Sequence, residues 1–273
     1  MGVPGILGES LCVLRGFPMT TKERQCMSLL GGISGLLDDL FDEPGKNAGH
    51  LEKFIHDPES LVPVNTHEKL LKHLYIKGLS YSPHPNKIKV EAHEVFKAQQ
   101  KSIGQKYLTT EESISDLTFL KGGNSFKYYR LCLFHPHKED EEEMIYQLGG
   151  LMQLGNDIFD IWKDTQDGIS TVATIATNIN LLRENFAWQL EKTNSLASAL
   201  NYQPAPKEKF RRMINLAIAR IFVCLDQFEA LQTQTGGKFL VKNYSRKQLI
   251  CDMQKPVNQL KAIHYYLHLP VKK

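Results

Sequence analysis

The sequence lacks the features that mark several protein classes. It contains no uninterrupted apolar run of about 18 residues, so we expect no membrane-spanning helix. Its first residues carry no positively charged stretch before an apolar one, so we expect no signal peptide. The five cysteines are odd in number and form no CxxC motif, which argues against a zinc ribbon or a disulfide framework. We interpret them as core thiols of a cytoplasmic protein.

A strong charge imbalance is missing as well. The formal net charge is +3, and the basic residues form no patch interleaved with aromatic residues. We therefore expect no nucleic-acid partner. A chain of 273 residues with 42% hydrophobic content can bury a sizeable core. We expect residues 1–273 to form a single all-helical domain, with a homodimer as an open alternative.

The segment Gly149–Asp164, GGLMQLGNDIFDIWKD, is predicted to be a buried helix with one narrow polar line. Its apolar residues cover an arc far wider than the stripe of a surface helix, so the polar line is expected to face a cavity. The acids also lie near the C-terminal end, where the helix dipole disfavours negative charge by about 0.3–1 kcal/mol each. These features favour a bound cation over a solvated acidic stripe. At about 100° per residue the line consists of Asn156, Asp160 and Asp164, with Asp157 and Lys163 at its edges.

A second acidic cluster ends the predicted helix that begins near Cys26 and stops at Pro44 and Gly45. Asp38 and Asp42 are one helical turn apart, with Asp39 and Glu43 on the adjacent edge. The preceding turns of the same face carry only small residues. Glycine within a helix costs about 1 kcal/mol relative to alanine, so these residues need a reason. The small residues are Ser28, Gly31, Ser34 and Gly35. Their small size allows either close helix packing or room for an apolar ligand.

Two facing carboxylate clusters would repel each other. Two like charges about 5 Å apart at an effective dielectric constant near 20 repel by roughly 3 kcal/mol. An all-oxygen ligand set without histidine or cysteine favours Mg²⁺, which commonly bridges to a phosphate group. The sequence therefore predicts a phosphorylated substrate with an apolar body.

The two clusters resemble the metal-binding motifs of the class I isoprenoid synthases. DDLFDE, from Asp38 to Glu43, is similar to the aspartate-rich DDxxD/E motif of that family, and NDIFDIWKD, from Asn156 to Asp164, is similar to its NDxx(S/D)xxx(E/D) motif. The resemblance implies an all-α, class I terpenoid synthase-like helical bundle around a central cavity. The start of the chain departs from the family, which places several helices before the first motif. We expect either missing N-terminal helices, a trimmed bundle or a completing partner subunit.

The resemblance also implies roles for single residues. A cluster of about three Mg²⁺ ions, with Mn²⁺ as a substitute, would neutralise a diphosphate. Lys163 occupies the position of a lysine common in terpene cyclases. Arg246 is a loose match to an Arg-Tyr pair that closes over the diphosphate, against the alternative of a surface helix start. The implied metal ligands are Asp38, Asp39, Asp42, Asn156, Asp157, Asp160 and Asp164, of which all but Asp157 are also expected to act in catalysis.

Lys121 is a further candidate for diphosphate binding. It precedes Gly122 and Gly123, which we expect to break a helix and to open an anion site at a new helix N-terminus. The alternative is a simple kink with a solvated lysine. The acidic run from Lys138 to Glu143 is interpreted as a solvated first turn without a catalytic role.

These residues predict a Mg²⁺-dependent class I terpene synthase that ionises an allylic prenyl diphosphate and cyclises or rearranges the carbocation. A prenyl transferase, or an enzyme that condenses two prenyl diphosphates head to head as squalene and phytoene synthases do, is the alternative. A non-catalytic protein that binds an isoprenoid diphosphate is a third hypothesis. The asparagine-led second motif favours the cyclase.

Overall fold

The computed structural model describes residues 3–42, 48–108, 110–136, 138 and 140–269, and the side chains of all of these except residues 3, 34–42 and 48. Within this part the chain is all-helical and contains no β-strand. Its helices are α1 (Val3–Arg15), α2 (Thr21–Asp42), α3 (Ala48–His56), α4 (Thr66–Tyr81), α5 (Pro85–Ile103), α6 (Glu111–Arg130), α7 (Glu141–Phe159), α8 (Ile161–Gln166), α9 (Val172–Ile175), α10 (Ile179–Ala199), α11 (Pro204–Gln234), α12 (Arg246–Leu249) and α13 (Pro256–His268), with 3-10 turns η1 (Gln105–Tyr107) and η2 (Val241–Asn243).

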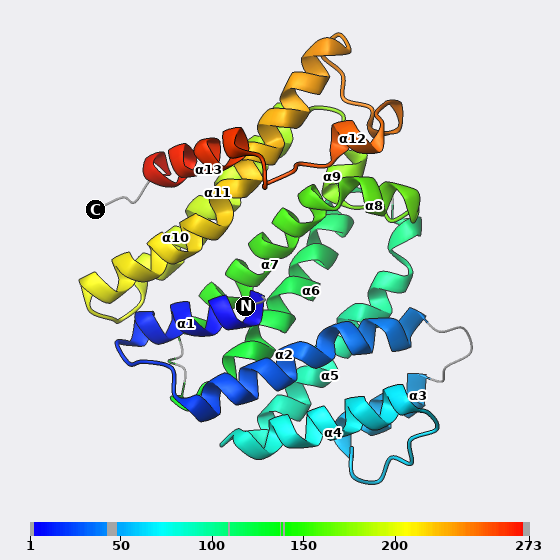
Figure 1. The fold of residues 1–273 in the computed structure, drawn as a ribbon, viewed down its shortest axis with the longest axis vertical. Helices are drawn as coiled ribbons and strands as arrows, with labels where there is room; N and C mark the ends of the chain where they lie inside the picture. The colour runs from blue at the N-terminus through cyan, green and yellow to red at the C-terminus, as the bar shows by residue number, and fades with distance from the viewer. Residues whose placement is uncertain (1–2, 43–47, 109, 137, 139, 270–273) are drawn as a thin grey trace.

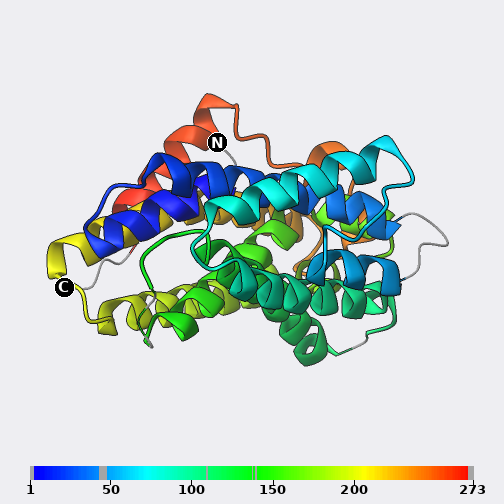
Figure 2. The same ribbon diagram turned by 90° about the horizontal axis from the view of Figure 1, so that it is seen from below.

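Helices α6 and α7 form the centre of the molecule and share its most extensive helix–helix contact. In Figure 1, α2, α3, α4 and α5 lie on one side of this pair, and α10, α11 and α13 lie on the other. Helix α1 contacts both α2 and α11. Figure 2 shows the same two groups from below. The central pair therefore joins a first half of the chain to a second half.

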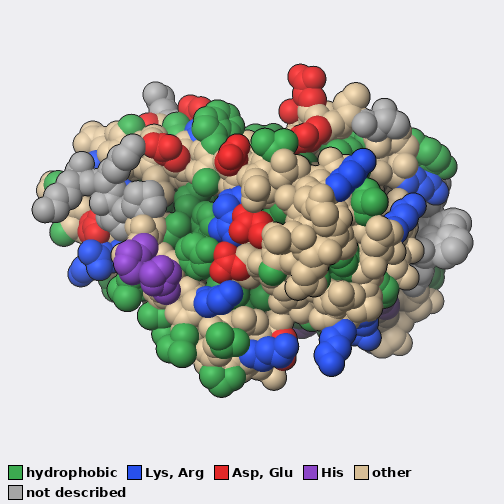
Figure 3. Space-filling view, turned by 90° about the horizontal axis from the view of Figure 1, so that it is seen from above, with side chains coloured by type: hydrophobic (Ala, Val, Ile, Leu, Met, Phe, Trp, Pro, Cys, Tyr) green, Lys and Arg blue, Asp and Glu red, His purple; other side chains and the backbone are tan. Residues whose placement is uncertain are grey.

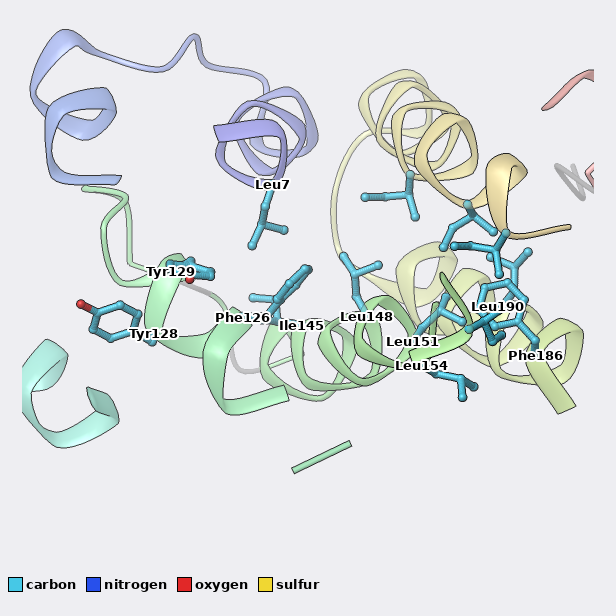
Figure 4. Close-up of a cluster of buried hydrophobic side chains, with 14 of the residues drawn as sticks. Leu7, Phe126, Tyr128, Tyr129, Ile145, Leu148, Leu151, Leu154, Phe186 and Leu190 are labelled. Atoms are coloured by element: carbon cyan, nitrogen blue, oxygen red, sulfur yellow. The ribbon is translucent and has the colours of Figure 1, made fainter. Parts of the chain in front are cut away.

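The hydrophobic core follows the length of α7. Figure 4 shows Leu151 and Leu154 of α7 beside Phe186 and Leu190 of α10, with Leu148 further along the same helix. All five side chains are buried. At the other end of the same row, Leu7 of α1 points toward Phe126 of α6. Helix α7 is apolar on most of its circumference because it is covered by helices on several sides.

The expected break at Gly122 and Gly123 is wrong. Helix α6 continues through both glycines to Arg130. The glycines serve close packing instead, because a methyl group at Gly123 would overlap the ring of Tyr146 on α7. Lys121 therefore lies in the middle of a helix, and the predicted anion site at a helix N-terminus does not form.

The predicted helix from Gly149 to Asp164 is interrupted once. Helix α7 ends at Phe159 and α8 begins at Ile161, with Asp160 between them. The backbone N–H of Asp160 still donates to the carbonyl of Asn156, and that of Asp164 donates to the carbonyl of Asp160. The spacing of one turn between the three polar residues is therefore kept.

The acidic run before α7 is not wholly solvated. Glu141 is buried, and its carboxylate accepts a hydrogen bond of 3.0 Å from Nε of Arg130, which is buried as well. The hydroxyl of Tyr202 also donates to Glu141. This pair joins the end of α6 to the start of α7 across the connecting turn. Among the described helices, none has the length and apolarity needed to cross a membrane.

Candidate functional site

A cavity of about 710 Å³ lies between the first half of the chain and the central helices. This volume falls within the range of about 300–1,000 Å³ that is usual for small-molecule sites. Its wall is contributed by α2, α3, α4, α5, α6, α7, α8 and the turns beside them. The polar and charged side chains of this wall include Lys106, Lys121, Ser125, Gln153, Asn156, Asp157, Asp160, Lys163, Asp164 and Asp167.

One part of the wall is apolar and rich in aromatic rings. Phe54 and Tyr75 lie against each other, with 5.2 Å between their ring centroids. Tyr128 and Tyr129 of α6 form a second pair at 5.5 Å. Helix α5 adds a fifth ring, Phe96. Aliphatic side chains complete this part of the wall, and they are Leu30, Ile33, Ile55, Val95, Ile103 and Ile169.

The polar part of the wall is the line predicted on α7 and α8. Asn156, Asp160 and Asp164 all face the cavity. The Asn156 side-chain amide donates a hydrogen bond of 3.1 Å to Oδ2 of Asp160. Figure 3 shows acidic and basic side chains beside a hollow with hydrophobic side chains in its wall. The helical spacing thus brings the three residues together on one side of the cavity.

Asp157 is the most buried carboxylate of this group, with 5% of its surface exposed. Its carboxylate accepts a hydrogen bond of 2.8 Å from Nε2 of Gln153 and one of 3.1 Å from Oγ1 of Thr118. Burial raises its pKa to about 6, although Gln153, Lys121 and Thr118 act in the opposite direction. Thr118 is a partner that the sequence alone did not reveal, because its contact depends on how α6 lies against α7, whereas Gln153 lies one turn before Asp157 on α7 itself.

Asp164 has the larger shift. Burial, followed by the negative charges of Asp157 and Asp160, raises its pKa to about 7. Lys163 and Lys121 lower the pKa but do not offset these effects. Burial and the repulsion between neighbouring carboxylates therefore both disfavour the charged form of Asp164. A bound cation would relieve that repulsion.

Three lysines line the cavity near these acids. Lys121 of α6 and Lys163 of α8 were predicted, whereas Lys106 of η1 was not. Within the described part of the chain, neither Lys121 nor Lys163 is engaged in an ion pair. Lys106 could not be foreseen because it lies on a short turn without helical periodicity. The side chains can thus present positive charge to an anion in the cavity.

Arg246 is a predicted site residue that is not brought to this wall. Arg246 is exposed at the start of α12 and does not line the cavity, although α12 contacts α8. Asp38, Asp39 and Asp42 belong to the last turns of α2, but their side chains lie outside the described residues, as does Glu43.

Gly31, on the glycine-rich face of α2, packs closely against α1. A methyl group at Gly31 would lie 2.7 Å from Cγ of Pro4 on α1, so Gly31 serves close helix packing. Among the described side chains of α2, Leu30 and Ile33 line the cavity.

The oxygen atoms of the cavity fit a hard divalent cation. Carboxylate and amide oxygens are the side-chain ligands that Mg²⁺ prefers. Burial raises the pKa of Asp157 and Asp164, and a bound cation would favour the charged form of both carboxyls. Asn156, Asp160 and Asp164 are the residues that would hold such an ion. In comparisons with protein-family models, with curated proteins and with solved structures, the chain matches none of them.

Proposed function

We propose that this chain is a Mg²⁺-dependent class I terpene synthase that ionises an allylic prenyl diphosphate. The observation that carries the proposal is one cavity with two different walls. Asn156, Asp160 and Asp164 form a polar wall beside Lys121 and Lys163, and aromatic and aliphatic side chains form the rest. A diphosphate with a hydrocarbon tail has the same two parts.

The residues of the polar wall would bind the diphosphate. Bound Mg²⁺ would supply charge neutralisation for the leaving group. Lys121 and Lys163 would bind diphosphate oxygens as point charges, since no ion pair engages them within the described residues. The allylic C–O bond would break with its electron pair on the diphosphate, and the protein would hold that anion away from the cation that remains.

The aromatic wall would receive the hydrocarbon part. Tyr128, Tyr129 and Phe96 line the cavity, and the face of an aromatic ring attracts a cation by about 0.5–2 kcal/mol. The surrounding apolar side chains would exclude water, which would otherwise capture the carbocation. Transfer of a proton from the carbocation to the released diphosphate would complete the reaction to a hydrocarbon product.

The experiment that tests the proposal is incubation of the purified chain with geranyl, farnesyl and geranylgeranyl diphosphate, each with and without Mg²⁺. Diphosphate release and organic products are followed together. We expect Mg²⁺-dependent release that falls at least about 100-fold in Asn156→Ala, because oxygen ligands that stabilise a leaving group contribute several kcal/mol. Asn180→Ala, at an exposed position on α10, should retain full activity.

The products separate the alternatives. A hydrocarbon built from one substrate molecule supports the cyclase, and a product that joins two prenyl units supports the condensing enzyme. If the folded protein releases no diphosphate but binds the substrates, the binding-protein hypothesis replaces the proposal. Asp38→Ala tests the first motif in the same assay.

A further inference from the structure

A second group of metal-ligating side chains lies outside the cavity. Glu52 and His56 come from α3, and His93 comes from α5. One ligand atom from each side chain lies within 4.8 Å of the other two. Nε2 of His93 is 2.7 Å from Oε1 of Glu52, and the rings of His56 and His93 have their centroids 4.6 Å apart. Three ligand groups from two helices therefore converge on one point.

The helix geometry explains this convergence. Glu52 and His56 are four residues apart, so their side chains lie on the same face of α3 one turn from each other. Helix α5 is the element that α3 contacts most extensively, and it brings His93 to that face. His93 is partly buried, whereas Glu52 and His56 are exposed. The group is therefore open to ions from solvent and has room for a water as a further ligand.

The donor atoms select the kind of ion. Two imidazole nitrogens with one carboxylate oxygen suit Zn²⁺, which binds nitrogen and oxygen at about 2.0–2.2 Å, whereas Mg²⁺ prefers oxygen alone. Three protein ligands and an open position is a common arrangement around zinc. Side-chain rotations would close the ligands around the ion, because none of the three is locked in the core. We propose that Glu52, His56 and His93 bind a divalent transition-metal ion, Zn²⁺ in the first place.

The position of this site gives the ion a structural role. Phe54 and Ile55 of α3 line the cavity, and so do Val95 and Phe96 of α5. The three ligands are interleaved with these residues in sequence but do not line the cavity themselves. A bound ion would thus connect α3 to α5 behind the apolar wall and fix the distance between them. This inference concerns a site separate from the carboxylates of α7 and α8, and it does not depend on the proposed function.

The test is calorimetric titration of the full chain, first stripped of metal with a chelator, with Zn²⁺ and with Mg²⁺. Four proteins are compared: the wild type, His56→Gln, His93→Gln and the control His73→Gln, which changes an exposed histidine on α4. We expect wild type and control to bind Zn²⁺ with equal affinity. Each ligand variant should bind at least about tenfold more weakly, because even the loss of an outer-shell partner costs 10–100-fold.

Thermal unfolding provides a second measurement. Zn²⁺ should raise the Tm of the wild type and of His73→Gln, and it should raise the Tm of the ligand variants less. If His93→Gln does not fold, His56→Gln decides, since His56 is exposed and circular dichroism can confirm its fold. Equal Zn²⁺ affinity in all four proteins, or no Zn²⁺ binding by the wild type, would overturn the proposal. The first result would indicate binding to other side chains, and the second a hydrogen-bonded cluster without a metal.

Discussion

Gly122 of α6 and Gly149 of α7 are in direct backbone contact. A methyl group built on Gly122 would lie 2.2 Å from the carbonyl oxygen of Gly149, and one built on Gly149 would lie 2.2 Å from the carbonyl oxygen of Gly122. The two central helices therefore approach each other more closely than any other residue type would permit. Lys121, next to this contact, is thereby held close enough to Asp157 for its charge to lower the pKa of that carboxyl.

Substitution of either glycine by alanine should separate the two helices. We expect Gly122→Ala and Gly149→Ala each to lower the free energy of unfolding by about 1–3 kcal/mol, because the opposing atoms are backbone and cannot rotate away. Gly32→Ala is the matched control, since nothing lies within 4 Å of its added methyl group. Gly32→Ala should raise the free energy of unfolding by about 0.5–1 kcal/mol, because alanine has less conformational freedom than glycine in the unfolded chain. Urea unfolding measures all three, and equal stability of Gly122→Ala and Gly32→Ala would contradict the packing described.

Features that depend on the periodicity of a single helix could be predicted from the sequence. The line of Asn156, Asp160 and Asp164 depends on helical periodicity alone, and the structure places it on one wall of the cavity even though Asp160 interrupts the helix. The all-helical class follows from the same periodicity. Lys121 lines the cavity too, but for a different reason from the one we expected, since Gly122 contacts a neighbouring helix instead of ending its own.

Groups formed by side chains from two different helices could not be predicted from the sequence. Glu141 appeared to be one of several solvated acids, yet its partner Arg130 lies on another helix and makes it a buried ion pair. Glu52, His56 and His93 form no motif along the chain, because His93 comes from a different helix. Such groups depend on helix packing, which local periodicity does not specify.

Glu23 is a buried anion with a complete set of donors, and its loss should be costly. Its carboxylate pairs with Arg15 at 2.7 Å and accepts backbone hydrogen bonds of 2.8 Å from Thr20 and Phe134. We expect Glu23→Gln to lower stability by about 3–5 kcal/mol at neutral pH, because Arg15 would remain buried without a counter-charge. Glu111→Gln, at an exposed helix start, should change stability by less than about 0.5 kcal/mol. Chemical unfolding of both variants measures the difference.

The same carboxylate predicts the acid sensitivity of the protein. Burial alone would raise the pKa of Glu23, but the donors from Phe134, Thr20 and Arg15 outweigh it and hold the pKa at about 2. A carboxyl with a lowered pKa stabilises the fold above its unfolded value of about 4.3, and this stabilisation disappears as the pH falls toward 2. The gap in stability between wild type and Glu23→Gln should therefore narrow progressively below about pH 4. A constant gap would mean that the charge of Glu23 is not what stabilises this junction.

Arg183 should hold the last helix in place. It lies on α10, pairs with Glu229 and with Asp226 at 2.8 Å, and donates a hydrogen bond of 3.3 Å to the hydroxyl of Tyr265 on α13. None of the residues of α13 is buried, and this helix contacts the core through the partly buried Ala262, Tyr265 and Tyr266. We expect Arg183→Met to increase amide hydrogen exchange in α13 by roughly tenfold or more, equivalent to at least about 1.4 kcal/mol. Exchange in α7 should not change.

Lys192→Met is the control for this prediction. Lys192 is exposed on α10, the helix that carries Arg183, and its ammonium group lies 5.9 Å from the centre of the Trp188 ring on the same helix. Such an exposed cation–π contact contributes about 0.5–1 kcal/mol. Lys192→Met should leave exchange in α13 near the wild-type value. Equal protection of α13 in the two variants would show that its other contacts are sufficient to hold the helix. These are the stacking of Tyr265 on Phe222, with ring centroids 5.3 Å apart, and the direct contacts of Tyr265 and Lys261 with Asp226.

Asp164 should make the metal-free protein less stable as the pH rises. Its pKa of about 7 in the folded chain lies above the usual value near 3.9, so folding disfavours its charged form. Between these two values the unfolded chain loses the proton while the folded chain keeps it, and stability falls with increasing pH. We therefore expect Asp164→Asn to exceed the wild type by about 1–3 kcal/mol near pH 8 and to match it near pH 4, measured by urea unfolding in the presence of a chelator. Asp116→Asn, at an exposed position of α6, should follow the wild type at both pH values.

If a divalent cation binds beside Asp164, excess Mg²⁺ should stabilise the wild type near pH 8 but stabilise Asp164→Asn less, because the ion would stabilise the charged form of Asp164 and lower its pKa. An advantage of Asp164→Asn that is the same at both pH values would show that packing, and not the charge of this carboxyl, sets its effect on stability.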